Sequence, residues 1–254
     1  MTHRMKLVAS LFAVAGLLLA GSVWANGKGL GIKGSPHDFT DNYTDEITGN
    51  VALETGTGGW NDSRQEICRV CHVPHDHQKA AKFYLNGLLW NHQVSSASYT
   101  MYNAAFSSTL KGAQSAQPDG TAKLCLGCHD GTVALDAFDG KLTGTAGNEI
   151  QNIYGAGLKG FMVPGASSPS DLRGTHPLSI TYDTTADTKL QPTTTAMGTS
   201  GTIADVLDNG KVQCSSCHDV HDQESVAGTN LLRVAQTVAQ GGNPSGLCLT
   251  CHVK

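Results

Sequence analysis

The chain has 254 residues, of which 30 are glycine and 39% are hydrophobic. Because glycine, serine and threonine are abundant and large aliphatic residues are sparse, the composition does not predict a conventional globular core. Its 17 basic and 21 acidic residues give a formal net charge of −4, which argues against nucleic acid as a partner.

The first 25 residues have the pattern of a secretory signal peptide. Basic residues precede an apolar run at positions 7–19, and a small-residue cleavage site ends at Ala25. The apolar run is shorter than the ~20 residues that a membrane span needs, and no cysteine for a lipid anchor lies near the cleavage site. We therefore expect a secreted mature chain, residues 26–254, without a membrane anchor.

Short helices and few strands are expected along the mature chain, because glycine, proline, serine and threonine interrupt it repeatedly. A helix is expected to begin at a capping-box pattern that starts with Ser63. The expected helices are Ser63–Cys71, Thr121–Cys128, Asn230–Ala239 and Ser245–Cys251, with a strand at Ser179–Tyr182. The predicted fold class is mostly irregular coil.

All eight cysteines lie in four Cys-x-x-Cys-His motifs. This motif attaches a covalent c-type haem: both thiols add to the haem vinyl groups, and the histidine binds the iron. A disulfide framework would not need a histidine after every second cysteine. Zinc sites need cysteine pairs about 15–20 residues apart, whereas these motifs lie 57, 89 and 34 residues apart. The predicted attachment residues are Cys68, Cys71 and His72; Cys125, Cys128 and His129; Cys214, Cys217 and His218; and Cys248, Cys251 and His252.

Four covalent haem c groups would leave about 57 residues of mature chain for each haem, which is little protein for a core of its own. We therefore expect the chain to wrap around a stack of haems. The scattered aspartates and glutamates are expected to keep the surface solvated.

The two halves of the mature chain repeat one order of motifs. Each has a lone histidine, His37 or His176, followed by Cys-x-x-Cys-His-x-x-His and then by Leu-Cys-Leu-x-Cys-His. This order predicts two duplicated two-haem units, at residues 26–140 and 165–254, within one tetrahaem domain.

Histidines outside the motifs can supply a second ligand to each iron. The repeat favours four of them, which are His37, His75, His176 and His221. His92 is a weaker candidate and His77 a weaker one still. Methionine ligands, which would raise the reduction potential, are disfavoured because the repeat contains none.

His75 and His221 each follow a motif histidine by three residues. Three residues span at most ~10–11 Å, which is too short a path around a porphyrin edge to its opposite face. We therefore expect each of them to bind the iron of a neighbouring haem, which would hold two haems close together.

Several segments besides the haem motifs carry a resemblance to a known family. They are Ser35-Pro36-His37-Asp38, Leu89-Trp90-Asn91-His92, Cys125 to Asp136 and Thr175-His176-Pro177. Over nearly the whole mature chain, the sequence resembles the filament-forming multihaem cytochromes of metal-reducing bacteria. The resemblance implies an extracellular polymer of stacked haems with two histidine ligands each. Such a polymer passes electrons to other cytochromes, metal oxides or electrodes. In such filaments a histidine can come from the neighbouring subunit, and His37 is the candidate because it lies near the mature N-terminus.

Two other functions use the same motifs. A monomeric periplasmic electron shuttle, or the electron-donor subunit of a reductase, would need no polymer. An enzyme would need a haem iron with an open position, and the spare histidines make an open position unnecessary. No lysine replaces a motif histidine, and there is no serine triad, phosphate loop or paired-carboxylate pattern. We therefore expect an electron carrier at the cell surface and not an enzyme.

Overall fold

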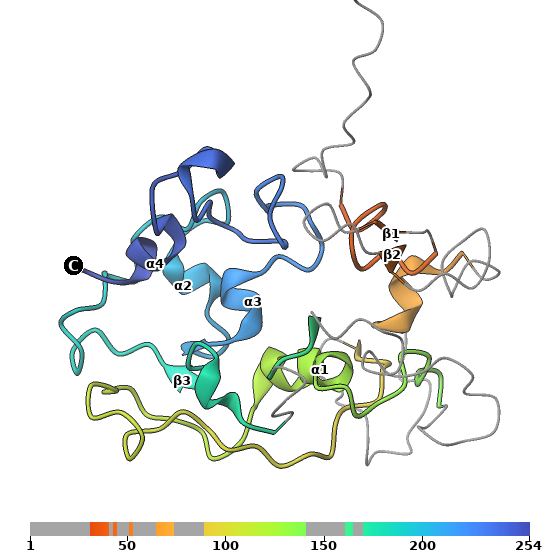
Figure 1. The fold of residues 1–254 in the computed structure, drawn as a ribbon, viewed down its shortest axis with the longest axis horizontal. Coiled ribbons are helices and arrows are strands. Elements are labelled where there is room, and N and C mark those ends of the chain that lie inside the picture. The colour runs from red at the N-terminus through yellow and green to blue at the C-terminus, as the bar shows by residue number, and fades with distance from the viewer. Residues whose placement is uncertain are drawn as a thin grey trace, which may run out of the picture.

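The computed structural model describes residues 31–40, 43–44, 51–52, 65–73, 89–140, 161–164 and 170–254 (Figure 1). Over these residues the chain is mostly coil and turns, with a few short helices and two-residue strands. The irregular fold expected from the composition is therefore confirmed. The predicted signal peptide, His75 and His77 lie outside the described residues.

The regular elements are short. The α-helices are α1 (Gly120–His129), α2 (Ile203–Val206), α3 (Cys214–Cys217) and α4 (Gly246–Cys251). The 3-10 helices are η2 (Ile67–Val70), η5 (Leu172–Gly174) and η6 (Val238–Gln240). The strands are β1 (Tyr43–Thr44), β2 (Val51–Ala52), β3 (Ile180–Thr181) and β4 (Lys211–Val212), and they form two antiparallel ladders, β1 with β2 and β3 with β4. Among the described residues, no helix has both the length and the apolar character needed to cross a membrane.

Most of the expected elements lie close to their predicted positions. The helices expected at 121–128 and 245–251 are α1 and α4, and the strand expected at 179–182 is β3. The helix expected at Ser63–Cys71 is present only in part: Gln65 has a φ of 51°, and the 3-10 helix η2 covers Ile67–Val70.

The helix expected at Asn230–Ala239 is wrong. Leu231 has a φ of 58°, in the left-handed region that a helix cannot contain. Leu232 instead forms an antiparallel bridge with His218, and the Arg233 N–H donates to the Cys217 carbonyl at 2.9 Å. The backbone groups of Leu232 and Arg233 therefore bond to the third Cys-x-x-Cys-His motif and cannot form the hydrogen bonds of a helix.

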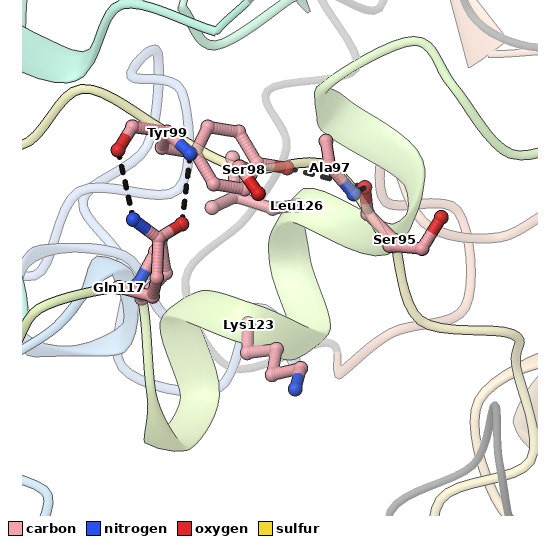
Figure 2. Close-up of a pocket in the computed structure, with 9 residues that line it drawn as sticks. Ser95, Ala97, Ser98, Tyr99, Gln117, Lys123 and Leu126 are labelled. Atoms are coloured by element: carbon pink, nitrogen blue, oxygen red, sulfur yellow. Dashed lines mark hydrogen bonds between the residues drawn. The ribbon is translucent and has the colours of Figure 1, made fainter.

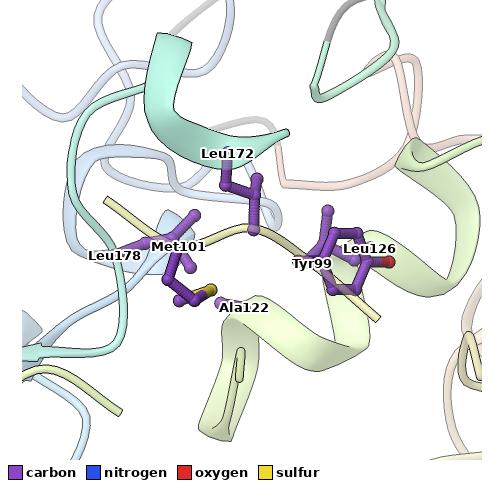
Figure 3. Close-up of a cluster of buried hydrophobic side chains, with 6 residues drawn as sticks. All are labelled: Tyr99, Met101, Ala122, Leu126, Leu172 and Leu178. Atoms are coloured by element: carbon purple, nitrogen blue, oxygen red, sulfur yellow. The ribbon is translucent and has the colours of Figure 1, made fainter. Parts of the chain in front are cut away.

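One small hydrophobic cluster holds α1 in place (Figure 3). Ala122 and Leu126 of α1 are at most 1% exposed. They pack together with Tyr99, Met101, Leu172 and Leu178. Gly127 allows a second close approach, because a Cβ at this position would lie 2.8 Å from the Gln93 carbonyl oxygen.

Helix α1 in the first half of the chain lies beside α3 in the second (Figure 1), and polar contacts join the two segments. The hydroxyls of Thr121 and Ser215 lie 2.7 Å apart. At the start of α1, the Asp119 carboxylate accepts from Lys211 at 2.5 Å and from Gln213 at 2.8 Å. The two helices that carry the second and third haem motifs are therefore neighbours.

Candidate haem-binding sites

We number the motifs in chain order, so that site 1 contains His72, site 2 His129, site 3 His218 and site 4 His252. Each motif is built on a short helical turn: η2, α1, α3 and α4. In sites 1, 3 and 4 the histidine N–H donates to the carbonyl of the first cysteine at 2.8–3.0 Å. Because residues three apart share one face of a helical turn, this bond presents both thiols on the same side.

Outside their helical turns, three of the motif histidines pair with a distant segment. His72 forms an antiparallel bridge with Trp90, His218 with Leu232, and His252 with Leu190. The His72 ring also meets the edge of the Trp90 ring, with centroids 5.9 Å apart. These bridges fix the direction in which each imidazole leaves the backbone.

Three motif histidines face a histidine from elsewhere in the chain. The ring centroids of His72 and His221 are 6.3 Å apart, with planes 29° from parallel. Those of His129 and His37 are 6.2 Å apart, and those of His252 and His176 are 6.3 Å apart. Metal–imidazole bonds are about 2.0–2.1 Å long, so two imidazoles on opposite sides of one metal ion have ring centres roughly 6.3 Å apart. The centroid distances of all three pairs match this spacing.

Backbone carbonyls orient several of these rings. Nδ1 of His129 lies 2.7 Å from the Phe161 oxygen, Nδ1 of His218 lies 2.7 Å from the Asn230 oxygen, and Nδ1 of His176 lies 2.9 Å from the Pro177 oxygen. A carbonyl can only accept, so Nδ1 carries the proton in each ring. Nε2 is then unprotonated, and its lone pair points away from the carbonyl and can bind a metal, as in many metal–histidine sites.

His37 also suits a metal ligand. Its Nδ1 atom is buried and has no hydrogen-bond partner among the described residues. Burial, followed by repulsion from His129, lowers the pKa of His37 to about 3. The ring is therefore neutral at physiological pH, which is the protonation state that metal binding requires. The His37 ring faces His129 of the same chain, with ring centroids 6.2 Å apart.

The eight cysteines are all described, and none forms a disulfide. Burial, and then the charge of Cys128, raise the pKa of Cys71 to about 12. Cys125 and Cys214 share a hydrogen bond, which raises the pKa of Cys125 and lowers that of Cys214.

The thiols of sites 3 and 4 also interact. Burial, and then the charge of Cys251, raise the pKa of Cys217 to about 11. Thiols of consecutive sites therefore interact: Cys71 with Cys128, Cys125 with Cys214, and Cys217 with Cys251. Among the described residues, no group of three or more cysteine, histidine or acidic side chains is arranged to hold a bare metal ion.

Networks of polar contacts brace sites 1 and 3. At site 1, Arg69 donates to Asp139 at 2.9 Å, and Asn91 donates to both the Arg69 carbonyl and Asp139. At site 3, Arg233 donates to the Ser215 carbonyl at 3.0 Å and to Glu224 at 2.8 Å. Each arginine therefore ties a haem motif to a segment distant in sequence.

His92, the weaker ligand candidate, is buried next to site 2, with Nε2 3.6 Å from the Cys128 Sγ atom. It is 0% exposed, with Nδ1 2.9 Å from the Gln93 oxygen and Nε2 3.2 Å from the Leu135 oxygen. Its ring belongs to none of the three pairs. His218 faces no second imidazole among the described residues, and the candidate His75 lies outside them.

Buried aspartates directly follow four of the described candidate ligands, and the sequence analysis did not single them out. Asp38, Asp130, Asp219 and Asp222 directly follow His37, His129, His218 and His221, and they are 3%, 1%, 5% and 3% exposed. The expectation that acidic residues lie at the surface is wrong for these four. The repeated His-Asp dipeptide was the available signal.

A shallow pocket of about 180 Å³ lies between residues 95–99, Gln117 and α1 (Figure 2). Gln117 accepts from the Tyr99 N–H at 2.8 Å and donates to the Tyr99 carbonyl at 2.9 Å. The pocket lining includes Tyr99, Gln117 and Lys123 but none of the histidines or cysteines of the four motifs.

No known protein family matches the chain, and no curated protein matches it. Its function is therefore argued from the motifs and from the geometry of the paired histidines.

Proposed function

We propose that the chain is an electron-transfer protein that holds four covalent haem c groups. The observation that carries the proposal is the pairing of motif histidines with distant histidines at 6.2–6.3 Å between ring centroids. A bound haem would supply a one-electron exchange between ferric and ferrous iron. The cysteines of each motif would hold it covalently, and the paired imidazoles would hold the iron from both faces.

The repeat identifies the second ligand of site 3. In both halves the lone histidine faces the last motif of its own half: His37 faces His129, and His176 faces His252. His221, in the second half, crosses to His72 of the first half. His75 is the equivalent of His221 in the first half, and His218 is the equivalent of His72 in the second. We therefore assign His75 to His218.

With two histidines at every iron, no position is open for a small substrate. The chain's residues then serve to hold and orient the irons, and the protein acts as an electron carrier and not as an enzyme. The contact between the helices of sites 2 and 3, where the Thr121 and Ser215 hydroxyls lie 2.7 Å apart, supports this role, because neighbouring haems exchange electrons rapidly.

We further propose that copies of the chain associate into an extracellular filament at the cell surface. The resemblance to filament-forming multihaem cytochromes and the secretory pattern of residues 1–25 support this proposal. The partners would be further copies of the chain, other cytochromes, and acceptors such as metal oxides and electrodes.

The test begins with the haem content of the secreted protein. The absorption spectrum in alkaline pyridine is expected to give four haem c groups per chain, and electron paramagnetic resonance is expected to show only low-spin iron. Electron microscopy of the haem-containing surface fraction should show fibres with a continuous series of irons. Discrete particles, or haem confined to the periplasm, would favour the monomeric shuttle.

His75→Ala tests the fourth pair. It should convert one of four irons to high spin, while His77→Ala, two residues further on, should leave all four low-spin. If His75→Ala leaves four low-spin irons, the ligand of site 3 comes from elsewhere, such as another subunit.

A further inference from the structure

The indole nitrogen of Trp90 is a buried hydrogen-bond donor without an acceptor. Nε1 of Trp90 is shielded from solvent and has no hydrogen-bond partner within the described part of the chain. A buried N–H that finds no acceptor costs free energy, so native proteins leave few of them. Such a donor indicates an acceptor that is not part of the described chain.

Backbone pairing places Trp90 on the same face as the motif histidine of site 1. The N–H groups of Val73 and Asn91 donate across the antiparallel bridge between His72 and Trp90, at 3.0 and 2.9 Å. Residues that lie opposite each other between two such bonds direct their side chains to the same face, where they are closest. The two ring centroids are accordingly 5.9 Å apart, with the ring planes at 90°. The unpaired indole N–H therefore belongs to site 1.

The side chain of Asn91 holds this segment against the first motif. Its amide donates to the Arg69 carbonyl at 2.5 Å and to the Asp139 carboxylate at 3.0 Å, and its oxygen accepts from the Asp139 N–H at 3.3 Å. Trp90 directly precedes Asn91, so the indole cannot leave site 1 without breaking these bonds.

The charged groups of the first motif are already paired. The Arg69 guanidinium donates to Asp139 at 2.9 Å and to Glu66 at 3.2 Å, so two carboxylates compensate its charge. The Asp139 carboxylate in turn accepts from both Arg69 and Asn91. An acceptor that binds at site 1 can use the Trp90 N–H without displacing any of these contacts.

The chemistry of haem c limits what this acceptor can be. The pyrrole nitrogens bind the iron and the thioether sulfurs are weak acceptors, so the propionate carboxylates are the strong acceptors of the group. A hydrogen bond to a carboxylate is also stronger than a bond between neutral groups.

We infer that Trp90 donates its indole N–H to a propionate of the haem at site 1 and thereby orients that haem. The inference rests on the proposed haem function and deepens it. A donor that draws negative charge away from the haem favours ferrous iron. Trp90 is therefore a positioning residue that also raises the reduction potential of site 1.

Trp90→Phe in the haem-loaded protein, with an isotope label in the propionate carboxylate carbons, tests the inference. The infrared difference spectrum between the oxidised and reduced states should show that the band of one labelled carboxylate has shifted. A potentiometric titration should show that one redox step has fallen by about threefold in its equilibrium constant, or about 28 mV for one electron. The other steps should not change.

Two further variants separate the hydrogen bond from ring size. Replacing Trp90 by benzothienylalanine puts sulfur in place of the N–H and keeps the fused ring, and it should give the same band shift and the same fall in potential. Tyr102→Phe is the matched control. It removes a polar group from an aromatic ring that packs on Phe106, with centroids 5.0 Å apart, and belongs to none of the four motifs. It should change neither measurement.

The outcomes distinguish the two proposals. A wild-type protein without four low-spin haems would overturn the proposed function. Four low-spin haems with unchanged labelled bands and unchanged potentials in both Trp90 variants would overturn only the propionate contact. An effect of Trp90→Phe that benzothienylalanine does not reproduce would also overturn it, because ring size would then be the cause. If Trp90→Phe fails to load haem, the benzothienylalanine protein decides.

Discussion

His221 faces His72 with ring centroids 6.3 Å apart, although the two residues belong to opposite halves of the chain. His221 follows His218 by three residues, so one short segment serves both site 1 and site 3. The halves of the chain are therefore interlocked: under the proposed function, site 1 receives its second ligand only when the second half has folded against the first.

Replacing His221 tests this interlock. His221→Ala should leave four covalent haems but convert one of them, at site 1, from low spin to high spin, because the iron loses one imidazole. His221→Met should restore a sixth ligand and raise the potential of that haem, because a thioether favours ferrous iron. Absorption and electron paramagnetic resonance spectra measure both effects. A fully low-spin His221→Ala protein would contradict the pairing with His72.

His92→Leu should cost stability without changing iron coordination. The imidazole is buried and lies against the carbonyl oxygens of Gln93 and Leu135, so leucine leaves a buried hydrogen-bonding group unsatisfied. The expected loss is about 1–3 kcal/mol in the free energy of unfolding. Denaturant titration measures this loss, and the haem spectrum should keep four low-spin irons. A high-spin signal would show instead that His92 is a ligand.

Gly127→Ala should destabilise the packing of α1. The added Cβ would lie 2.8 Å from the Gln93 carbonyl oxygen, closer than side chains normally approach backbone. Overpacking of this kind costs about 1–3 kcal/mol. Gly174→Ala is the matched control, because a Cβ there has no neighbour within 4 Å, and it should change stability by less than about 0.5 kcal/mol. Equal melting temperatures of the two variants would refute the close contact.

Acid should weaken the contact between the start of α1 and Lys211. Burial alone would raise the pKa of Asp119, but hydrogen bonds from Lys211, Ser115 and Gln213 lower it to about 2 from an ordinary value of 3.8. A lowered folded-state pKa means that this stabilisation is complete above the unfolded pKa and is lost as the pH falls from 3.8 toward 2.

Urea titrations across this pH range should show a shallower acid dependence in Asp119→Asn than in the wild type. The side chain of Asp119 is 39% exposed, so solvent screens the interaction and the difference should be small. A dependence that is identical in both proteins would contradict the assignment.

The prediction from sequence was successful where the decisive chemistry is local. The helices at sites 2 and 4 could be expected because the motif and its flanking residues define one or two turns. The helix expected at 230–239 did not form, because Leu232 and Arg233 pair with the third haem motif, a contact that no local pattern predicts.

The sequence by itself determined which residues are candidates for haem attachment and iron ligation, because the Cys-x-x-Cys-His spacing and the repeat are properties of neighbouring residues. Only the tertiary structure decided that His221 faces His72, that His37 faces a histidine of its own chain, and that Asp38 and Asp130 are buried. These relationships depend on distances between segments far apart in the chain. Burial and hydrogen bonding across such distances arise only when the whole chain has folded.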